Sequence, residues 1–242
     1  RYNMQLKNAK VLVTGGSDGY GRGIAAVLKK AGAEVWITGR NVEKLEKAAE
    51  ELGVRTIQAD ASSGADWDRV MRETGELDVL VNNAGFGGKI VPVAEQTDED
   101  IIRTIGTNLT GVVLGCRRAG AMMAKRKRGI IINISSVCAL YAWPGWSVYT
   151  AAKAGVAKFS HGLYTELRPH GVRVSCVTPS WGQTGFNHAA NISGASENPE
   201  LAAKCIAPEE LGNIVRCIIE QPDHLAVPDI TVQPVIQDIS PM

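Results

Sequence analysis

Residues 130–153 read IIINISSVCALYAWPGWSVYTAAK. The stretch begins with an almost continuous β-branched run, which is typical of a parallel strand covered on both faces. Ser135 and Ser136 follow at the end of that strand, and the carboxyl ends of strands are where open α/β sheets bind ligands. Tyr149 and Lys153 are four residues apart, so on a helix their side chains lie on one face. The stretch therefore predicts a serine hydroxyl that faces a phenol and an ammonium group.

Length and composition indicate a single domain and favour no macromolecular partner. It has 242 residues, 45% of them hydrophobic, and no Pro- or Ser-rich linker divides it, so we expect one α/β domain over residues 1–242. The net charge of +1 favours neither a nucleic-acid nor a membrane partner. The one basic cluster, Lys125–Arg128, is typical of a helix end, with Gly129 as its cap.

The cysteine pattern gives no sign of a metal site. Five cysteines are scattered along the chain without Cys-x-x-Cys or Cys/His ligand spacing. Unpaired thiols suit a reducing compartment, and no segment has the pattern of a signal peptide or a membrane span. We therefore expect a cytoplasmic protein with no metal.

A glycine-rich turn near the amino terminus indicates a phosphate-binding site. The apolar strand Lys10–Thr14 runs into GGSDGYG, where Gly15, Gly19 and Gly21 stand at a turn and at the start of a helix, and the strand Glu34–Thr38 follows. This is the context in which dinucleotides bind. Glycines let the backbone approach a pyrophosphate, and the helix N-terminus offers unpaired N–H groups to it.

The end of the second strand reports on the cofactor. NAD-binding units place an Asp or Glu there, whereas this chain has Gly39 and then Arg40, whose guanidinium suits the 2′-phosphate of NADP. Asp18, inside the glycine turn, is expected near the same ribose and argues the other way, unless it pairs with Arg40. The sequence favours NADP, with NAD as the open alternative.

Hydrophobic periodicity predicts alternating helices and strands along the remaining chain. Helices are expected at residues 42–52, 67–73, 98–123, 149–167 and 208–220, and strands at 55–58, 77–81, 173–178 and 230–235. Residues 182–199 are rich in Gly, Asn, Ser and Ala and lack periodicity, and a loop of that length is typically disordered or a functional lid. We expect a substrate lid around residues 182–205.

Together these motifs carry a family resemblance. In chain order they are Thr14-Gly15-x-x-x-Gly19-x-Gly21, Asp60, Asn82-Asn83-Ala84-Gly85, Asn108, Ser136 and Tyr149-x-x-x-Lys153. Each motif is modest alone, but their order and spacing, over residues 11–220, resemble the short-chain dehydrogenase/reductases of the Tyr-x-x-x-Lys type. The resemblance implies a single-domain Rossmann fold, a doubly wound parallel sheet of about seven strands with helices on both faces.

The resemblance also implies four catalytic residues. Tyr149 would be the general acid in reduction and the base in oxidation, and Ser136 would hold the substrate oxygen. Lys153 would bond the nicotinamide ribose, and Asn108 would support a water that feeds the proton relay. A free phenol has a pKa near 10, so we expect the ammonium of Lys153 and the positive nicotinamide of the oxidised cofactor to lower the pKa of Tyr149.

Further residues are implied as cofactor contacts. They are Gly15, Ser17, Asp18, Gly19, Tyr20, Gly21, Arg40, Asp60, Ala61, Asn83, Ala84, Gly85, Tyr149, Lys153, Pro179 and Thr184. Of these, Asp60 and Ala61 would contact the adenine, Asn83 its ribose, and Thr184 the nicotinamide carboxamide. Two positions depart from the family pattern, since Tyr20 replaces a small aliphatic residue and Pro179-Ser180 replaces Pro-Gly.

The substrate pocket is expected to be rich in aromatic residues. We expect Ser136, Cys138, Trp143, Tyr149 and Trp181 to line it, with further walls from Phe86, Tyr141 and Trp146 and a lid around Phe186–His188. Such walls indicate an apolar or flat substrate, although these rings would equally pack a core or a subunit interface. Lys89 or His188 would be the groups available for a carboxylate. Residues 228–237, PDITVQPVIQ, instead resemble a subset that acts on small polar substrates such as hydroxy acids and semialdehydes.

Two functional hypotheses follow. The leading one is an NADP-dependent oxidoreductase that interconverts a small-molecule alcohol and a ketone or aldehyde. The alternative is a non-catalytic NAD(P)-binding sensor or scaffold, because a fold does not fix a function. The resemblance further implies a homodimer or homotetramer that associates through the helices bearing Asn108 and Tyr149.

Overall fold

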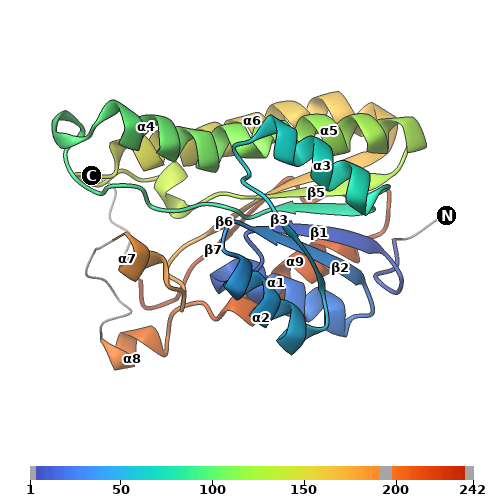
Figure 1. The fold of residues 1–242 in the computed structure, drawn as a ribbon, viewed down its shortest axis with the longest axis horizontal. Coiled ribbons are helices and arrows are strands. Elements are labelled where there is room, and N and C mark those ends of the chain that lie inside the picture. Colours follow the sequence, from blue (N-terminus) through green and yellow to red (C-terminus); the bar gives the residue numbers. More distant parts are fainter. Residues whose placement is uncertain (1–3, 191–197, 238–242) are drawn as a thin grey trace.

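Seven short strands form one parallel sheet (Figure 1). The computed structural model describes residues 4–190 and 198–237. The strands are β1 (Lys10–Thr14), β2 (Glu34–Gly39), β3 (Arg55–Gln58), β4 (Val79–Asn82), β5 (Gly129–Ile134), β6 (Val172–Pro179) and β7 (Asp229–Val232). They lie in the order β3-β2-β1-β4-β5-β6-β7, and every neighbouring pair is parallel. The predicted Rossmann architecture is confirmed.

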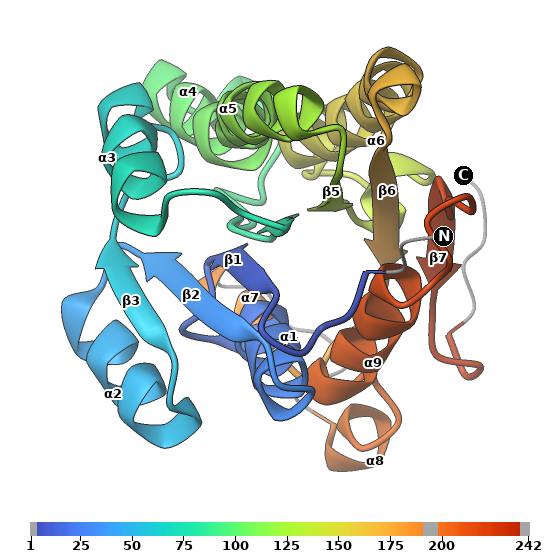
Figure 2. The same cartoon turned by 90° about the vertical axis from the view of Figure 1, so that its right-hand side faces the viewer.

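Helices cover both faces of this sheet (Figure 2). On one face lie α1 (Gly19–Lys30), α2 (Val42–Leu52) and α9 (Pro208–Ile219). On the other lie α3 (Gly64–Thr74), α4 (Asp98–Ile105), α5 (Gly111–Arg126) and α6 (Ser147–Leu167). Two short helices, α7 (Phe186–Ala189) and α8 (Pro199–Ala202), lie between β6 and α9 in sequence. Helices on both faces explain why the inner strands β1, β4 and β5 are largely apolar without alternation, since both of their sides are buried, whereas the edge strands β3 and β7 keep exposed residues.

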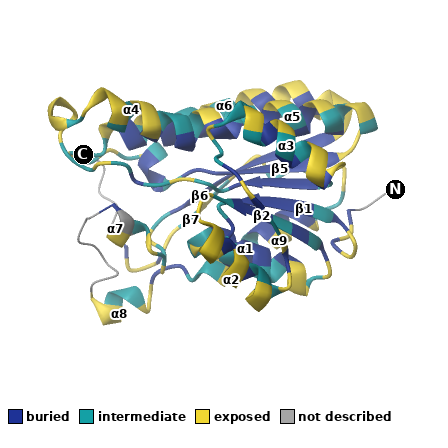
Figure 3. Cartoon of the chain, viewed as in Figure 1, coloured by how far each residue is buried: buried dark blue, intermediate teal, exposed yellow. Residues whose placement is uncertain are grey.

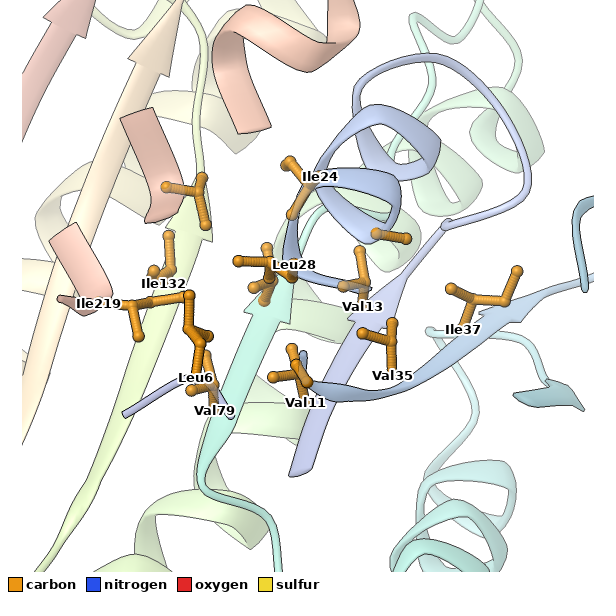
Figure 4. Close-up of a cluster of buried hydrophobic side chains, with 14 of the residues drawn as sticks. Leu6, Val11, Val13, Ile24, Leu28, Val35, Ile37, Val79, Ile132 and Ile219 are labelled. Carbon is orange, nitrogen blue, oxygen red and sulfur yellow. The ribbon is translucent and has the colours of Figure 1, made fainter. Parts of the chain in front are cut away.

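Each face of the sheet has its own hydrophobic core. Along β1, Val11 and Val13 pack toward α1 and α9, whereas Leu12 between them packs toward α3 and α5. All three side chains are fully buried. Figure 4 shows the first core, where Ile24 and Leu28 of α1 meet the strands, and Figure 3 shows the exposed residues on the outer helix surfaces. The two cores hold the sheet rigid beneath its carboxyl edge.

The predicted final strand, residues 230–235, is wrong at its end. The strand β7 stops at Val232. Pro234 has no N–H to donate to a neighbouring strand, and its carbonyl accepts a hydrogen bond from the N–H of Gln237 (3.0 Å) in a turn. The chain therefore folds back toward the carboxyl end of β6, where the Ser180 hydroxyl bonds the Gln237 side chain.

The predicted helix over residues 98–123 is not one regular helix. A π-helical turn, Gly106–Thr110, separates α4 from α5 and carries Asn108. The Asn108 side-chain amide donates to the backbone carbonyl of Thr104 (3.0 Å), four residues earlier. A side chain thus takes a carbonyl that a main-chain N–H would bond in an α-helix, and π-turns of this kind occur often at functional sites.

The basic cluster does end a helix, but Gly129 is not its cap. The helix α5 ends at Arg126, and Lys127 adopts the left-handed conformation with φ of 55°. The Lys127 N–H bonds the carbonyls of Ala124 and Met123. A cap at Gly129 is therefore wrong, and that glycine is instead the first residue of β5 and passes closely over the Met123 side chain.

The expected lid, residues 182–205, is only partly described. The structure places α7 and α8 within it, so it is not the featureless loop that its composition suggests, while residues 191–197 lie outside the described residues. Asn198 caps α8 by accepting a hydrogen bond from the N–H of Glu200 (3.0 Å). Among helices of the described ranges, none is long and apolar enough to cross a membrane.

Candidate active site

One cavity of about 780 Å³ lies at the carboxyl ends of the strands and gathers most of the predicted site residues. Those that line it are Gly15, Ser17, Asp18, Gly19, Tyr20, Arg40, Asp60, Ala61, Asn83, Ala84, Gly85, Ser136, Cys138, Trp143, Tyr149, Lys153, Pro179, Trp181 and Thr184. Two predicted residues, Gly21 and Asn108, are buried and do not line it. Of the residues proposed as further pocket walls or carboxylate ligands, Tyr141, Lys89 and His188 do not line it.

The glycine turn has the shape of a cradle that side chains would fill. Gly15 has φ of 64°, and an added Cβ there would lie 2.9 Å from Cα of Ala84. An added Cβ at Gly21 would lie 2.2 Å from the Gly15 carbonyl oxygen, so Gly21 serves the packing of α1 against the turn. Asp18 caps α1 by accepting a hydrogen bond from the N–H of Gly19 (2.8 Å). The turn and the helix N-terminus together fit a pyrophosphate group.

Asn83, directly after the neighbouring strand β4, stabilises this turn. Its side-chain amide donates to the carbonyl oxygens of Thr14 and Gly15, both at 3.1 Å. The hydroxyl of Thr14 in turn accepts from the backbone N–H groups of Asn83 and Ala84 (3.0 Å each). Both amide hydrogens of Asn83 are thus used inside the protein, which leaves only its side-chain oxygen for the predicted contact to a ribose.

A positively charged end of the cavity lies after β2. Arg40, Asn41 and Lys44 line it, and Asn41 caps α2 by accepting from the N–H of Lys44 (2.9 Å). The ammonium of Lys44 lies 3.0 Å from the Asp18 carboxylate, and this hydrogen bond lowers the pKa of Asp18. The suggested pairing of Asp18 with Arg40 is wrong, because the first turn of α2 places Lys44 beside Asp18 instead. The Arg40 guanidinium lies over the Phe86 ring, 5.9 Å from its centroid.

The other end of the cavity holds Tyr149 and Lys153 on one face of α6. Their exposed fractions are 6% and 4%. The Lys153 ammonium donates to the carbonyl of Ile134 at the end of β5 (3.1 Å) and lies 5.7 Å from the centroid of the Tyr149 ring. Gly85 lies between this ammonium and Asn108, since an added Cβ would be 3.4 Å from the former and 2.7 Å from the side-chain oxygen of the latter.

The two serines at the end of β5 have different partners. The Ser135 hydroxyl donates to the carbonyl of Lys153 (2.9 Å), which ties the strand to α6. The Ser136 hydroxyl accepts from the N–H of Cys138 (3.2 Å) and acts on the phenol of Tyr149, whose pKa it lowers. The structure therefore pairs Ser136, and not Ser135, with Tyr149.

The expected lowering of the Tyr149 pKa does not occur in the protein alone. Burial removes water from the phenol and raises its pKa above the ordinary value, and the Ser136 hydroxyl opposes this only in part. Burial also lowers the pKa of Lys153 to about 8. The prediction counted the charge of the neighbouring ammonium and not the cost of burying both groups. The phenol is therefore neutral at pH 7, as a proton donor must be.

Asn108 has its hydrogen bonds satisfied by the protein. Its side-chain amide donates to the carbonyls of Phe86 (2.8 Å) and Thr104 (3.0 Å), and its oxygen accepts from the N–H of Phe86 (3.2 Å). The π-turn thereby fixes the loop that follows β4, directly beneath the cavity. A role for Asn108 in a proton relay stays a prediction.

Tyr20, which departs from the family pattern, joins the glycine turn to the segment after β6. Its hydroxyl donates to the carbonyl of Ser180 (3.0 Å). An added Cβ at Gly182 would lie 2.2 Å from the Tyr20 hydroxyl oxygen, so the two positions match in size. The two departures from the pattern, at residues 20 and 180, therefore meet in space.

Sequence reasoning missed several polar residues of the cavity, among them Lys44 and Gln237. Lys44 lies in the first turn of the predicted helix that directly follows Arg40, and this proximity in sequence was a usable signal. Gln237 had no such signal, because the turn after β7 that brings it to Ser180 depends on the tertiary fold.

The comparisons with known proteins agree with this geometry. The sequence model of the family described as short chain dehydrogenase matches residues 9–193. This chain is a short-chain dehydrogenase/reductase. As a member of this family it is an NAD(P)-dependent oxidoreductase that acts on CH–OH groups.

Its relatives include a serine 3-dehydrogenase of Agrobacterium fabrum, 30% identical over 239 residues that cover 95% of each chain. An NADP-dependent 3-hydroxy acid dehydrogenase, YdfG of Salmonella typhi, is 33% identical over 240 residues, which are 95% of this chain and 96% of the relative. Among solved structures, a closed serine dehydrogenase complexed with NADP⁺ superimposes with a TM-score of 0.89 at 30% identity, covering 96% of this chain and 98% of that one.

Proposed function

We propose that this dehydrogenase uses NADP to interconvert an alcohol and a ketone or aldehyde, with Tyr149 as the general acid and base. The observation that carries the proposal is the shared cavity. A glycine cradle at a helix N-terminus occupies one part of it, and the Ser136–Tyr149 pair with Lys153 occupies another. When bound, NADP supplies the group that gives or accepts a hydride.

The residues of the chain handle the substrate oxygen and its proton. In reduction, the neutral phenol of Tyr149 donates its proton to the oxygen of the carbonyl as a hydride reaches the carbon. The Ser136 hydroxyl stabilises the charge that develops on that oxygen. In oxidation the direction reverses, and the phenolate takes the hydroxyl proton of the alcohol. Lys153, held by the Ile134 carbonyl, places a positive charge beneath the Tyr149 ring that favours the phenolate.

The charged end of the cavity supports NADP over NAD. Arg40 and Lys44 line it together, and within the described residues no carboxylate pairs with Arg40. Asp18, the acid that argued for NAD, is already neutralised by Lys44. Arg40 therefore keeps a guanidinium that no carboxylate of the described residues neutralises, which suits the 2′-phosphate that distinguishes NADP. Relatives and solved neighbours described as NADP-dependent or NADP-bound support the same choice.

Further parts of the proposal come from the sequence. Residues 1–242 would act as one catalytic domain, with the segment around 182–205 as the substrate lid. A homodimer or homotetramer and a cytoplasmic location remain predictions.

Turnover tests the proposal directly. Purified protein with NADPH and a panel of ketones and aldehydes should oxidise the cofactor, measured by its absorbance. Tyr149→Phe, which removes only the hydroxyl, should lower kcat by about 100-fold or more while NADPH still binds, since general acid catalysis contributes on that order. Tyr164→Phe, on the same helix and outside the cavity lining, is the matched control and should keep normal turnover.

The alternative function gives a different result. A sensor or scaffold would bind NADPH tightly and turn over none of the panel. Full turnover by Tyr149→Phe would refute the assigned role of the phenol, although the enzyme class would stand.

A further inference from the structure

The reacting end of the cavity has aromatic and apolar walls. The cavity that holds the phenol of Tyr149 is also lined by Cys138, Trp143, Trp146, Trp181 and Phe186. These side chains come from three separate segments: the 3₁₀ turn and loop after β5, the segment after β6, and α7. Trp181 remains 40% exposed although it is a large apolar residue. An exposed indole in the lining of this cavity offers apolar surface to a ligand.

Three of these rings form an ordered cluster. Trp146 lies edge-on to Tyr149, with 5.6 Å between ring centroids, and stacks on Phe186 at 6.2 Å with an interplanar angle of 14°. Phe186 also contacts Tyr149, at 5.5 Å. Gly87 permits this packing, because an added Cβ would lie 3.0 Å from the Phe186 ring. The rings exclude water from the phenol, which agrees with the raised pKa of Tyr149.

Two of the three cations that line the cavity belong to a segment outside this wall. Only three Lys or Arg residues line the cavity within the described ranges: Arg40, Lys44 and Lys153. Arg40 and Lys44 belong to the segment after β2, and Lys153 is 4% exposed with its ammonium bonded to the Ile134 carbonyl. In the sequence, residues 191–197 and 238–242 contain no Lys, Arg or His.

The two candidate carboxylate ligands are placed elsewhere. The Lys89 ammonium donates to the carbonyl of Glu95 (3.3 Å) and lies 4.0 Å from the Asp100 carboxylate, outside the cavity lining. His188 is exposed and does not line the cavity either. A substrate carboxylate beside Tyr149 would lose its water without gaining a charged partner, which is costly.

We infer that the substrate of this enzyme is an uncharged carbonyl compound, or the corresponding alcohol, that carries an aromatic or bulky apolar group. This inference rests on the proposed function. It separates the chain from relatives that are named for serine and for 3-hydroxy acids, whose substrates bear a carboxylate. The apolar group would lie against Trp143 and Trp181, with the carbonyl oxygen toward Ser136 and Tyr149.

Matched pairs of compounds test the charge directly. Ethyl benzoylformate and benzoylformate share one ketone and one phenyl ring, and differ in whether the neighbouring group is an ester or a carboxylate. With the NADP⁺-loaded protein, quenching of tryptophan fluorescence should give a Kd at least about tenfold lower for the ester. With NADPH, kcat/KM should favour the ester by a similar factor, and serine and 3-hydroxybutyrate should be poor substrates with NADP⁺.

The two measurements separate the possible failures. Equal or tighter binding of the carboxylate would overturn the inference, whether or not turnover occurs. Preferential binding of the ester without turnover of any compound would support the inference about the pocket and contradict the proposed reaction.

An introduced cation provides the converse test. Trp181→Arg places a guanidinium on the exposed wall and should raise affinity for benzoylformate at least about tenfold while it weakens binding of the ester. Leu225→Arg makes the same change of charge at a residue that is 47% exposed and outside the cavity lining, and should alter neither affinity. If Trp181→Arg changes the two affinities no more than the Leu225→Arg control does, that side chain does not face the substrate, and the assignment of the wall fails.

Discussion

Replacement of Lys44 by glutamine is expected to weaken NADPH binding much more than NADH binding. The side chain lines the cavity beside Arg40 and neutralises Asp18 at 3.0 Å. The substitution removes one cation from the proposed phosphate site and leaves the carboxylate of Asp18 without that partner. The first change removes an attraction for the 2′-phosphate and the second adds a repulsion. NADH lacks this phosphate and is affected by neither.

The structure sets the size of the effect. The side chains of Lys44 and Asp18 are 59% and 62% exposed, so water and salt screen the interaction strongly. Two unit charges 4 Å apart interact by about 1 kcal/mol in water and about 4 kcal/mol at a typical protein surface. We expect a loss near the lower end of this range, about 1–2 kcal/mol, which corresponds to roughly 5- to 30-fold in the Kd of NADPH. Arg40→Gln should cost more, because a guanidinium can bind a phosphate through two hydrogen bonds.

Fluorescence titration of both cofactors measures these constants. The ratio of the NADH Kd to the NADPH Kd should fall in Lys44→Gln, and the difference from wild type should shrink at high salt, because 1 M salt screens charges beyond about 3 Å. Lys47→Gln removes an exposed lysine from the same helix outside the cavity lining and serves as the control. If Lys44→Gln weakened the two cofactors equally, or neither, the assignment of this end of the cavity to the 2′-phosphate would be refuted.

Two further substitutions test the buried parts of the site. Gly85→Ala should destabilise the fold by about 1–3 kcal/mol and lower activity, because the added Cβ would lie 2.7 Å from the side-chain oxygen of Asn108. The control is Gly162→Ala on α6, where the added Cβ meets open space, and it should stabilise the fold by up to about 1 kcal/mol in urea unfolding. Normal activity and stability in Gly85→Ala would contradict the close packing described. Lys153→Met should remove a pH dependence of the free energy of unfolding. Burial lowers the pKa of Lys153 from 10.5 to about 8, so between these pH values the unfolded chain keeps a proton that the folded chain has lost. As the pH rises from 8 to 10.5, the free energy of unfolding of the wild type should therefore increase by on the order of 3 kcal/mol relative to that of the variant. A flat difference across that range would show that the ammonium is solvated.

The strands and the cofactor-binding turn could be predicted because their signals are local. The strand over residues 10–14, the helix over 42–52 and the strand over 55–58 have the predicted bounds, set by apolar runs and by Gly and Asn at their ends. A strand that is buried on both faces can be recognised from a continuous apolar run. A phosphate-binding turn can be recognised from glycines between a strand and a helix.

The rest depends on contacts between distant residues. The π-turn around Asn108 exists because its side chain bonds both backbone groups of Phe86, 22 residues earlier, and helical periodicity gives no sign of this. The Tyr20 hydroxyl finds the Ser180 carbonyl across 160 residues. The raised pKa of Tyr149 follows from burial by Trp146 and Phe186, whereas sequence reasoning could count only the neighbouring charge of Lys153.

The two ends of the cavity are suited to different groups, one to the phosphates of the cofactor and the other to the substrate. Charged groups, Arg40 with the Lys44–Asp18 pair, lie at the end assigned to the adenosine, where the cofactor carries its phosphates. Uncharged rings surround Tyr149 at the other end, where Lys153 is already committed to the Ile134 carbonyl. A free cation beside Tyr149 would attract phosphates to the wrong end and hydroxy acids to the phenol. Its absence among the described residues therefore favours binding of the cofactor in one orientation, and it leaves the choice of substrate to shape and apolar contact.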